Sequence, residues 1–297
     1  MKFQNDNFQE LSFFFRKSLS LYSQSIENLE MRGFIISLFI FGMSVCYAVD
    51  IVAHRGDNQF APMNSVEAAK HAWFNGIKYV ESDFYETDDK TIVGAHCNKT
   101  IRLLSGDESL DIKNLTEHSC KSINLAKHPR EQAKGYSFVK IPTLDEFLWA
   151  MPPSAVLVFE AKNFSDTYAD NVEKAFKRTN TKLNQIVFIS FNEDACKGLK
   201  KKFPQCKVYF LLGGGKLSKG ADWAIAKCKQ LGVDGVDVVY KTKEGKLVSK
   251  DYVDKIKKAG LGFWVWTVNS KEYFLHCKKI GVEAITTDFA TAFKKLR

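Results

Sequence analysis

The segment Asp50-Ile51-Val52-Ala53-His54-Arg55-Gly56 joins a short apolar run to a polar turn. Such a run is typical of a buried strand, and the polar residues after it mark the strand's carboxyl end. Further β-branched runs follow along the chain and alternate with stretches of helical periodicity. This alternation predicts an α/β fold in which crossover helices join parallel strands.

Eight strands can be placed in this way, at Asp50–His54, Tyr79–Asp83, Ala155–Lys162, Ile186–Ser190, Val208–Leu212, Val236–Val239, Phe263–Thr267 and Ala284–Thr287. Helices are expected between them at Ser65–Asn75, Leu144–Met151, Tyr168–Arg178, Glu193–Phe203, Ala221–Leu231, Lys250–Ala259 and Lys271–Ile280, with Asn64 and Asn192 as N-caps. Eight such units in roughly 250 residues predict a (β/α)8 TIM barrel. A doubly wound open sheet is the alternative, but no GxGxxG motif follows the first strand.

One part of the chain breaks the alternation. The strand-like run Thr91–His96 follows Tyr79–Asp83 too closely for a crossover helix, so we expect it to return antiparallel. That hairpin would bring His96 roughly opposite Glu81. Residues 97–141 are then expected to form an irregular insertion, a small subdomain over the mouth of the barrel.

The first 48 residues are of a different kind. Residues 1–30 are a polar extension, and residues 31–48 combine a basic residue, a short apolar run and a closing Ala48, as in a signal peptide. We expect cleavage after Ala48 and export to the periplasm or the medium; an uncleaved segment 33–48 would act as a signal anchor. Translation could begin at Met1 or at Met31, and the barrel domain is expected to span 49–297.

Charge and cysteine content agree with an exported protein that binds anions. The chain has 43 Lys and Arg against 34 Asp and Glu, a net charge of +9, which favours phosphate substrates or an acidic membrane surface. No nucleic-acid motif accompanies the dispersed lysines, so no nucleic-acid partner is expected. Six cysteines follow the signal segment and permit disulfides, with Cys97–Cys120 the first pairing to expect; the alternative is that several are buried hydrophobic residues.

Polar side chains gather at the carboxyl ends of the predicted strands, where barrel active sites form. They are His54, Arg55, Glu81, Asp83, Glu160 and Lys162, with His96 on the hairpin. Each by itself has an ordinary structural explanation, such as a surface ion pair. Together, three carboxylates suit one divalent cation, Mg²⁺ or Ca²⁺, two histidines suit acid–base chemistry, and two cations suit a phosphoryl group. Trp266, at the end of a strand, is expected either to line the substrate pocket or to belong to the core.

This series of residues resembles the glycerophosphodiester phosphodiesterase family. The resemblance covers residues 50–297 and rests on motifs in the family's order: Ala53-His54-Arg55-Gly56, Pro62-x-Asn64-Ser65, Glu81-x-Asp83, Thr87-x-Asp89, Val93-x-x-His96, Ile141-Pro142-Thr143-Leu144-x-Glu146, Phe159-Glu160-x-Lys162, Ser190-Phe191, Trp266-Thr267-x-Asn269 and Ile285-Thr286-Thr287-Asp288. It implies a barrel with a small insertion and metal-dependent hydrolysis of glycerophosphodiesters to glycerol 3-phosphate and an alcohol.

The resemblance also implies residue roles. A divalent cation would be held by Glu81, Asp83 and Glu160; His54 and His96 would be the acid–base pair, and Arg55 and Lys162 would bind the phosphate. Two positions depart from the family pattern: Met63 stands where the family has Glu, and Cys97 where it has Asp. These departures leave the head group of the substrate open. The alternatives are a phospholipase D-like enzyme on a related barrel and a barrel that binds glycerophosphodiesters without catalysis.

Overall fold

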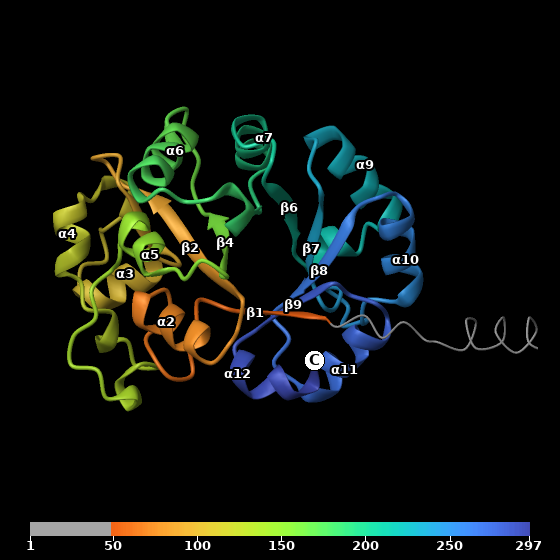
Figure 1. Ribbon diagram of the computed structural model, residues 1–297, viewed down its shortest axis with the longest axis horizontal. Coiled ribbons are helices and arrows are strands. Elements are labelled where there is room, and N and C mark those ends of the chain that lie inside the picture. The colour runs from red at the N-terminus through yellow and green to blue at the C-terminus, as the bar shows by residue number, and fades with distance from the viewer. Residues whose placement is uncertain (1–48) are drawn as a thin grey trace, which may run out of the picture. The chain divides into compact units, whose positions relative to one another are not determined.

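Parallel strands close into a barrel in the computed structural model, which describes residues 49–297 (Figure 1). The eight are β1 (Asp50–Ala53), β2 (Tyr79–Glu86), β4 (Val156–Ala161), β5 (Ile186–Ser190), β6 (Lys207–Leu212), β7 (Gly235–Val239), β8 (Gly262–Trp266) and β9 (Ala284–Thr287). Each pairs with its neighbour in parallel, and β1 pairs with both β9 and β2, which closes the ring. The prediction of a (β/α)8 barrel is therefore confirmed.

Helices lie between the strands and surround the barrel (Figure 1). The seven expected ones are α2 (Val66–Phe74), α5 (Leu144–Ala150), α6 (Tyr168–Thr179), α7 (Glu193–Lys202), α9 (Ala221–Leu231), α10 (Lys250–Lys258) and α11 (Lys271–Lys279), joined by the short α8 (Gly214–Leu217) and α12 (Ala290–Phe293). Single 3-10 turns occupy Leu183–Gln185 and Lys294–Leu296. Asn192 caps α7 as expected, but Ser65 rather than Asn64 caps α2.

Strand residues alternate between two cores, because successive side chains on a strand point to opposite faces. Outward residues such as Val236 and Val238 pack beneath the helices. Inward residues fill the barrel lumen, where Tyr209 stacks on Trp264 with ring centroids 4.6 Å apart. Gly235 makes room for this pair, since a Cβ there would lie 2.6 Å from Cε1 of Tyr209 and 2.3 Å from a backbone oxygen.

A hairpin and a small subdomain interrupt the barrel after β2. Strand β3 (Ile92–Gly94) runs antiparallel to β2 as expected, with Phe84 opposite Gly94. Continuing that register places His96 next to Ser82, one residue from the expected Glu81. The insertion is helical rather than irregular, with α3 (Asn98–Ser105), α4 (Glu117–Ser122) and 3-10 turns at Ile112–Asn114, Leu125–Lys127 and Gln132–Lys134.

The insertion has a hydrophobic core of its own, and this core explains the cysteines. Cys120 is fully buried in it among residues such as Ile112. Cys97 precedes α3, and its Sγ lies 3.4 Å from Oγ1 of Thr100. The expected Cys97–Cys120 disulfide is therefore wrong for this structure: all six cysteines of the described region are unpaired, and five are buried as small apolar side chains.

The expected extension at 1–30 and signal segment at 31–48 lie outside the described residues. Within residues 49–297, no helix combines the length and apolar character that a membrane span requires.

Candidate active site

The turn after β1 is built against two neighbouring elements. Arg55 and Gly56 both have positive φ angles, 55° and 80°. A Cβ at Gly56 would lie 2.6 Å from the Cβ of Ala68 in α2, so only glycine fits. The backbone N of Arg55 donates to Glu81 Oε2 at 2.8 Å, and the backbone N of Gly56 donates to the Glu81 carbonyl. These bonds fix His54 and Arg55 at the carboxyl end of the barrel.

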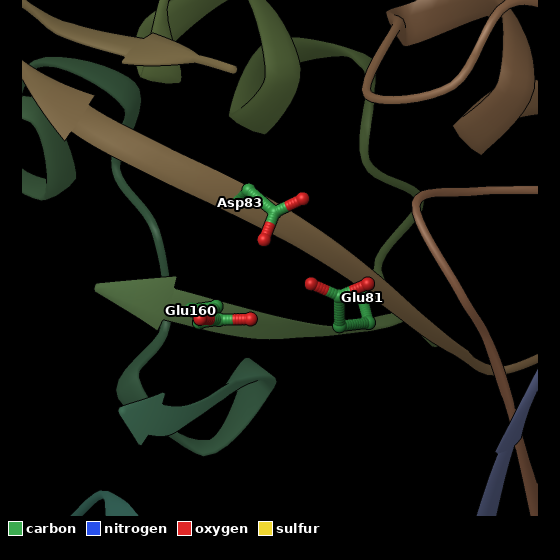
Figure 2. A group of neighbouring side chains, drawn as sticks. All are labelled: Glu81, Asp83 and Glu160. Carbon is green, nitrogen blue, oxygen red and sulfur yellow. The ribbon is translucent and has the colours of Figure 1, made fainter. Parts of the chain in front are cut away.

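Three carboxylates meet beside this turn. Glu81 and Asp83 project from β2, and Glu160 projects from β4 directly opposite Asp83 (Figure 2). One oxygen of each lies within 4.8 Å of the others. Oε1 of Glu81 is buried and has no hydrogen-bond partner. An acidic cluster with an unpaired buried oxygen fits a hard divalent cation, which prefers oxygen ligands.

Two basic side chains partly neutralise the cluster. Nε of Arg55 lies 3.2 Å from Asp83 Oδ2, and Nζ of Lys162 lies 2.8 Å from Glu160 Oε1 and 3.3 Å from Asp83 Oδ1. Burial opposes ionisation of Asp83, but Lys162 and Arg55 hold its pKa below the usual range. Burial and the Asp83 carboxylate raise the pKa of Glu160 to about 8, and burial raises that of Glu81. In the absence of a cation, the two glutamates are therefore held toward their protonated, neutral forms.

Asn64 orients Asp83, a role that the N-cap prediction missed. Its φ of 59° turns the side chain toward β2, where Nδ2 donates to Asp83 Oδ2 at 2.9 Å. Its Oδ1 accepts from the backbone N of Asp83 and from Oγ of Ser82. Two residues of the motif Pro62-x-Asn64-Ser65 thus have different roles: Asn64 orients a carboxylate, and Ser65 is the N-cap of α2.

His54 is held by the carboxylate of Asp288, a residue to which the sequence alone assigns no role. Nδ1 of His54 lies 2.6 Å from Oδ1 of Asp288, just after β9. Asp288 also accepts from the side-chain amides of Asn58 and Asn269. Burial works against ionisation, but the hydrogen bond from His54 keeps the pKa of Asp288 well below its usual range. An ionised Asp288 fixes the ring and stabilises positive charge on it.

His96 is in a different environment. Burial lowers the pKa of His96 to about 4; the Asp83 carboxylate opposes this shift, and Arg55 and Lys162 add to it. The imidazole is therefore neutral at neutral pH and free to accept a proton. The two histidines line the same cavity.

This cavity has a volume of about 110 Å³, and seven of the eight predicted site residues line it. The eighth, Asp83, does not line it and forms ion pairs with Arg55 and Lys162. Trp266 is on the opposite wall; its Nε1 donates to the backbone oxygen of Asp237 at 3.1 Å, and Phe191 meets it edge-on at 5.5 Å. Trp266 thus lines the pocket and also packs against the apolar core of the lumen.

A second cavity, of about 300 Å³, shares His54 and Arg55 with the first. The insertion contributes Arg130, Glu131 and Lys134 to its walls. Met63, one of the two departures from the family pattern, also lines it, and its sulfur accepts from Arg55 at 3.5 Å. The insertion therefore forms one side of this second cavity.

Comparisons with known proteins agree with this geometry. The model of the "Glycerophosphoryl diester phosphodiesterase family" matches residues 54–292. A glycerophosphodiester phosphodiesterase from Caldanaerobacter subterraneus is 27% identical over 242 residues, covering 80% of this chain and 93% of that protein. A glycerophosphodiester phosphodiesterase from Bacillus subtilis is 25% identical over 260 residues, covering 83% of this chain and 85% of that protein.

Solved structures give the same picture. The crystal structure of a glycerophosphodiester phosphodiesterase from Parabacteroides distasonis has a TM-score of 0.67 and 26% identity, and covers 84% of this chain and 96% of that one. An Oleispira antarctica phosphodiesterase, solved with the product sn-glycerol-3-phosphate, has a TM-score of 0.71 over 83% of this chain and 95% of its own. At 21% identity, that likeness shows the shared fold alone.

Proposed function

The chain belongs to the glycerophosphoryl diester phosphodiesterase family, and on that basis we propose that it hydrolyses glycerophosphodiesters to glycerol 3-phosphate and an alcohol. The proposal rests on the observation that two histidines, Arg55, Lys162 and two carboxylates of the acidic cluster all line the same cavity. Such a set matches the needs of phosphodiester cleavage, in which negative charge must be stabilised and two protons must move.

A divalent cation fits the acidic cluster, and we assign its ligands to Glu81, Asp83 and Glu160. All three are oxygen ligands, which favours a hard cation of the Mg²⁺ or Ca²⁺ type. When bound, this ion would supply positive charge to the phosphoryl oxygens. Arg55 and Lys162 provide further positive charge at the same point, and Arg55 is held there by Asp83.

The two histidines divide the proton transfers. His96, neutral at neutral pH, removes the proton from the attacking hydroxyl group. His54, which Asp288 holds through Nδ1, gives a proton to the leaving alkoxide. The attacking group is either water or a hydroxyl of the substrate's own glycerol; in the second case a cyclic phosphate forms and water opens it.

The assignment of the two histidines can be tested with His54→Ala and His96→Ala. Either change should lower kcat by about 10²–10⁴-fold on glycerophosphocholine. A glycerophosphodiester with a p-nitrophenol leaving group needs no proton from the enzyme. On that substrate His54→Ala should recover most of its activity and His96→Ala should not. Recovery of both variants, or of His96→Ala alone, would contradict the assignment.

The reaction itself is tested by a coupled assay for glycerol 3-phosphate. The protein is incubated with several soluble glycerophosphodiesters, with and without a chelator, and should release glycerol 3-phosphate only without it. No release from any soluble diester would contradict the proposed function, and head-group release from lysophospholipid micelles alone would favour the phospholipase D-like alternative. Release that survives chelation would contradict the role given to the acidic cluster.

We further propose that the protein is exported through residues 31–48, with cleavage after Ala48. The support is the sequence pattern of a basic residue, a short apolar run and a small closing residue. Mass spectrometry of the mature protein should find an N-terminus at Val49. Intact residues 31–48 would show instead that the segment is retained.

A further inference from the structure

Asp237, in β7, is a buried acid that the mechanism does not use. Its side chain is 1% exposed, and neither carboxyl oxygen has a hydrogen-bond partner. Among residues 49–297 it is the only carboxyl group with both oxygens buried and unpaired. Leaving such a group without a partner is costly, so it would be expected to persist only where it serves a purpose.

The strand pattern shows where this carboxyl group points. Its neighbours Val236 and Val238 face outward beneath the helices, so Asp237 faces the lumen. In register it lies between Leu211 of β6 and Trp264 of β8, both members of the closed apolar core of the lumen. On the remaining side is the active-site cavity, whose wall Asp237 forms with Trp266. The cavity is therefore the place from which a hydrogen-bond donor can come.

The residues that the structure describes do not supply that donor. Lys162 is bonded to Glu160 and Asp83, and His54 is bonded to Asp288. The indole N–H of Trp266 reaches the backbone oxygen of Asp237, not its carboxyl group. Burial and the Glu160 carboxylate raise the pKa of Asp237, as expected for an acid with no basic neighbour. The missing partner is thus a group that enters the cavity.

The two cavities indicate which part of the substrate brings the donor. They share His54 and Arg55, so a phosphate bound there can extend one arm into each. The larger cavity is bounded by the insertion, which suits the variable head group. The smaller one combines the apolar walls of Leu211 and Trp266 with one acid, and suits the short glycerol arm, whose hydroxyl groups are donors.

We propose that Asp237 binds a hydroxyl group of the glycerol arm and so determines which arm of the diester enters the lumen. This inference rests on the proposed function, because it places a glycerophosphodiester in the cavity. It assigns to Asp237 a substrate-binding role, separate from the acidic cluster.

Binding measurements separate this role from others. The metal-loaded protein is titrated with glycerol 3-phosphate, with propyl phosphate, which lacks the hydroxyl groups, and with phosphocholine. Asp237→Ala should weaken the binding of glycerol 3-phosphate by about 10- to 100-fold, since a hydrogen bond to a buried polar group is lost, and Asp237→Asn, which keeps one acceptor oxygen, should weaken it less. Propyl phosphate and phosphocholine should bind both variants as they bind the wild type. Asp222→Asn, an exposed position on α9, is the matched control and should change nothing.

Thermal stability provides a second measurement. Because the Asp237 carboxyl group has no partner among residues 49–297, both substitutions should leave Tm unchanged or raise it by roughly 2–4 °C. The proposal would be overturned if the variants bound glycerol 3-phosphate and propyl phosphate with equally weakened affinity, or if neither affinity changed. Weakened binding of phosphocholine alone would also overturn it. A marked fall in Tm would show a structural role instead. If the wild type bound no phosphate ester at all, the proposed function would fail, and this inference with it.

Discussion

Asp288 shows how one side chain outside the acidic cluster controls the chemistry. It accepts a hydrogen bond from Nδ1 of His54 at 2.6 Å and is itself held by Asn58 and Asn269. The sequence motif that contains it was recognised, but no pattern in the chain connects residue 288 to residue 54. Only the pairing of β9 with β1 brings the two together.

Replacing Asp288 by Asn should lower kcat by about 10²–10⁴-fold with little change in KM. The amide keeps the shape but no longer stabilises positive charge on His54, and it can donate to Nδ1 and leave the wrong tautomer. Steady-state kinetics on glycerophosphocholine measure the change. Asn269→Ala, which removes one donor to Asp288, should have a smaller effect. A change confined to KM would contradict the role given to Asp288.

Glu160 belongs to a cluster in which like charges meet without an equal number of cations. Glu160→Gln should therefore lower the affinity for Mg²⁺ or Ca²⁺ by at least about 10-fold, because a charged ligand is lost. It should also raise the Tm of the metal-free protein, since the burial of an ionisable carboxyl group and its repulsion with Asp83 are both removed.

Calorimetry with and without chelator separates these two effects of Glu160→Gln. Chelation should lower the Tm of the wild type and have little effect on the variant. A variant that binds the ion as tightly as the wild type would show that Glu160 is not a ligand.

At the scale of elements, the turn between β1 and α2 is joined to β2 by side chains as well as backbone. Asn64 makes three hydrogen bonds to Ser82 and Asp83 in a buried position. Asn64→Ala leaves these groups without partners and should cost about 3 kcal/mol of unfolding free energy. Urea denaturation measures this loss, and kcat should fall as well because Asp83 loses its orientation.

A helix cap provides the control for Asn64. Ser249 caps α10 through one bond to the backbone N of Tyr252, away from the cavity. Ser249→Ala should cost about 1 kcal/mol and leave kcat unchanged. Equal losses of stability in the two variants, with kcat unaffected in both, would show that Asn64 acts as an ordinary cap.

Over the whole described region, the cysteines form no disulfides, and five of the six are buried as small apolar side chains. Burial raises the pKa of Cys120, Cys196, Cys228 and Cys277 to about 12 and that of Cys206 to about 11. These thiols are protonated in the folded protein, whereas in the unfolded chain they ionise near pH 8.5. Their contribution to stability is thus present below about pH 8.5 and is lost as the pH rises toward 11 or 12, by up to about 1.4 kcal/mol per thiol and pH unit.

Two measurements test this behaviour. The urea midpoint should fall between pH 8 and pH 10, and less steeply in Cys228→Ala, which removes one of the buried thiols. At pH 8 a thiol reagent should modify Cys97 in the folded protein and all six described cysteines in urea, with the sites mapped by mass spectrometry. Rapid modification of Cys196 or Cys277 in the folded state would contradict the argument.

The sequence by itself determined the barrel, because strand and helix periodicities are local and each apolar run indicates that the segment is buried. All seven expected helices and all eight expected strands formed within a few residues of their expected ends. The local motifs also placed His54, Glu81, Asp83, Glu160 and Lys162 at strand ends, where a parallel barrel brings them to one rim. The insertion was harder, since its short helices and turns carry little periodicity.

The tertiary structure decided what depends on contacts between distant segments. It showed that Asn64 holds Asp83, that Asp288 supports His54, and that Cys97 and Cys120 remain unpaired. It also showed that Asp237 faces the active-site cavity with no partner. None of these follows from spacing along the chain, because a side chain's partners depend on which strands become neighbours when the barrel closes.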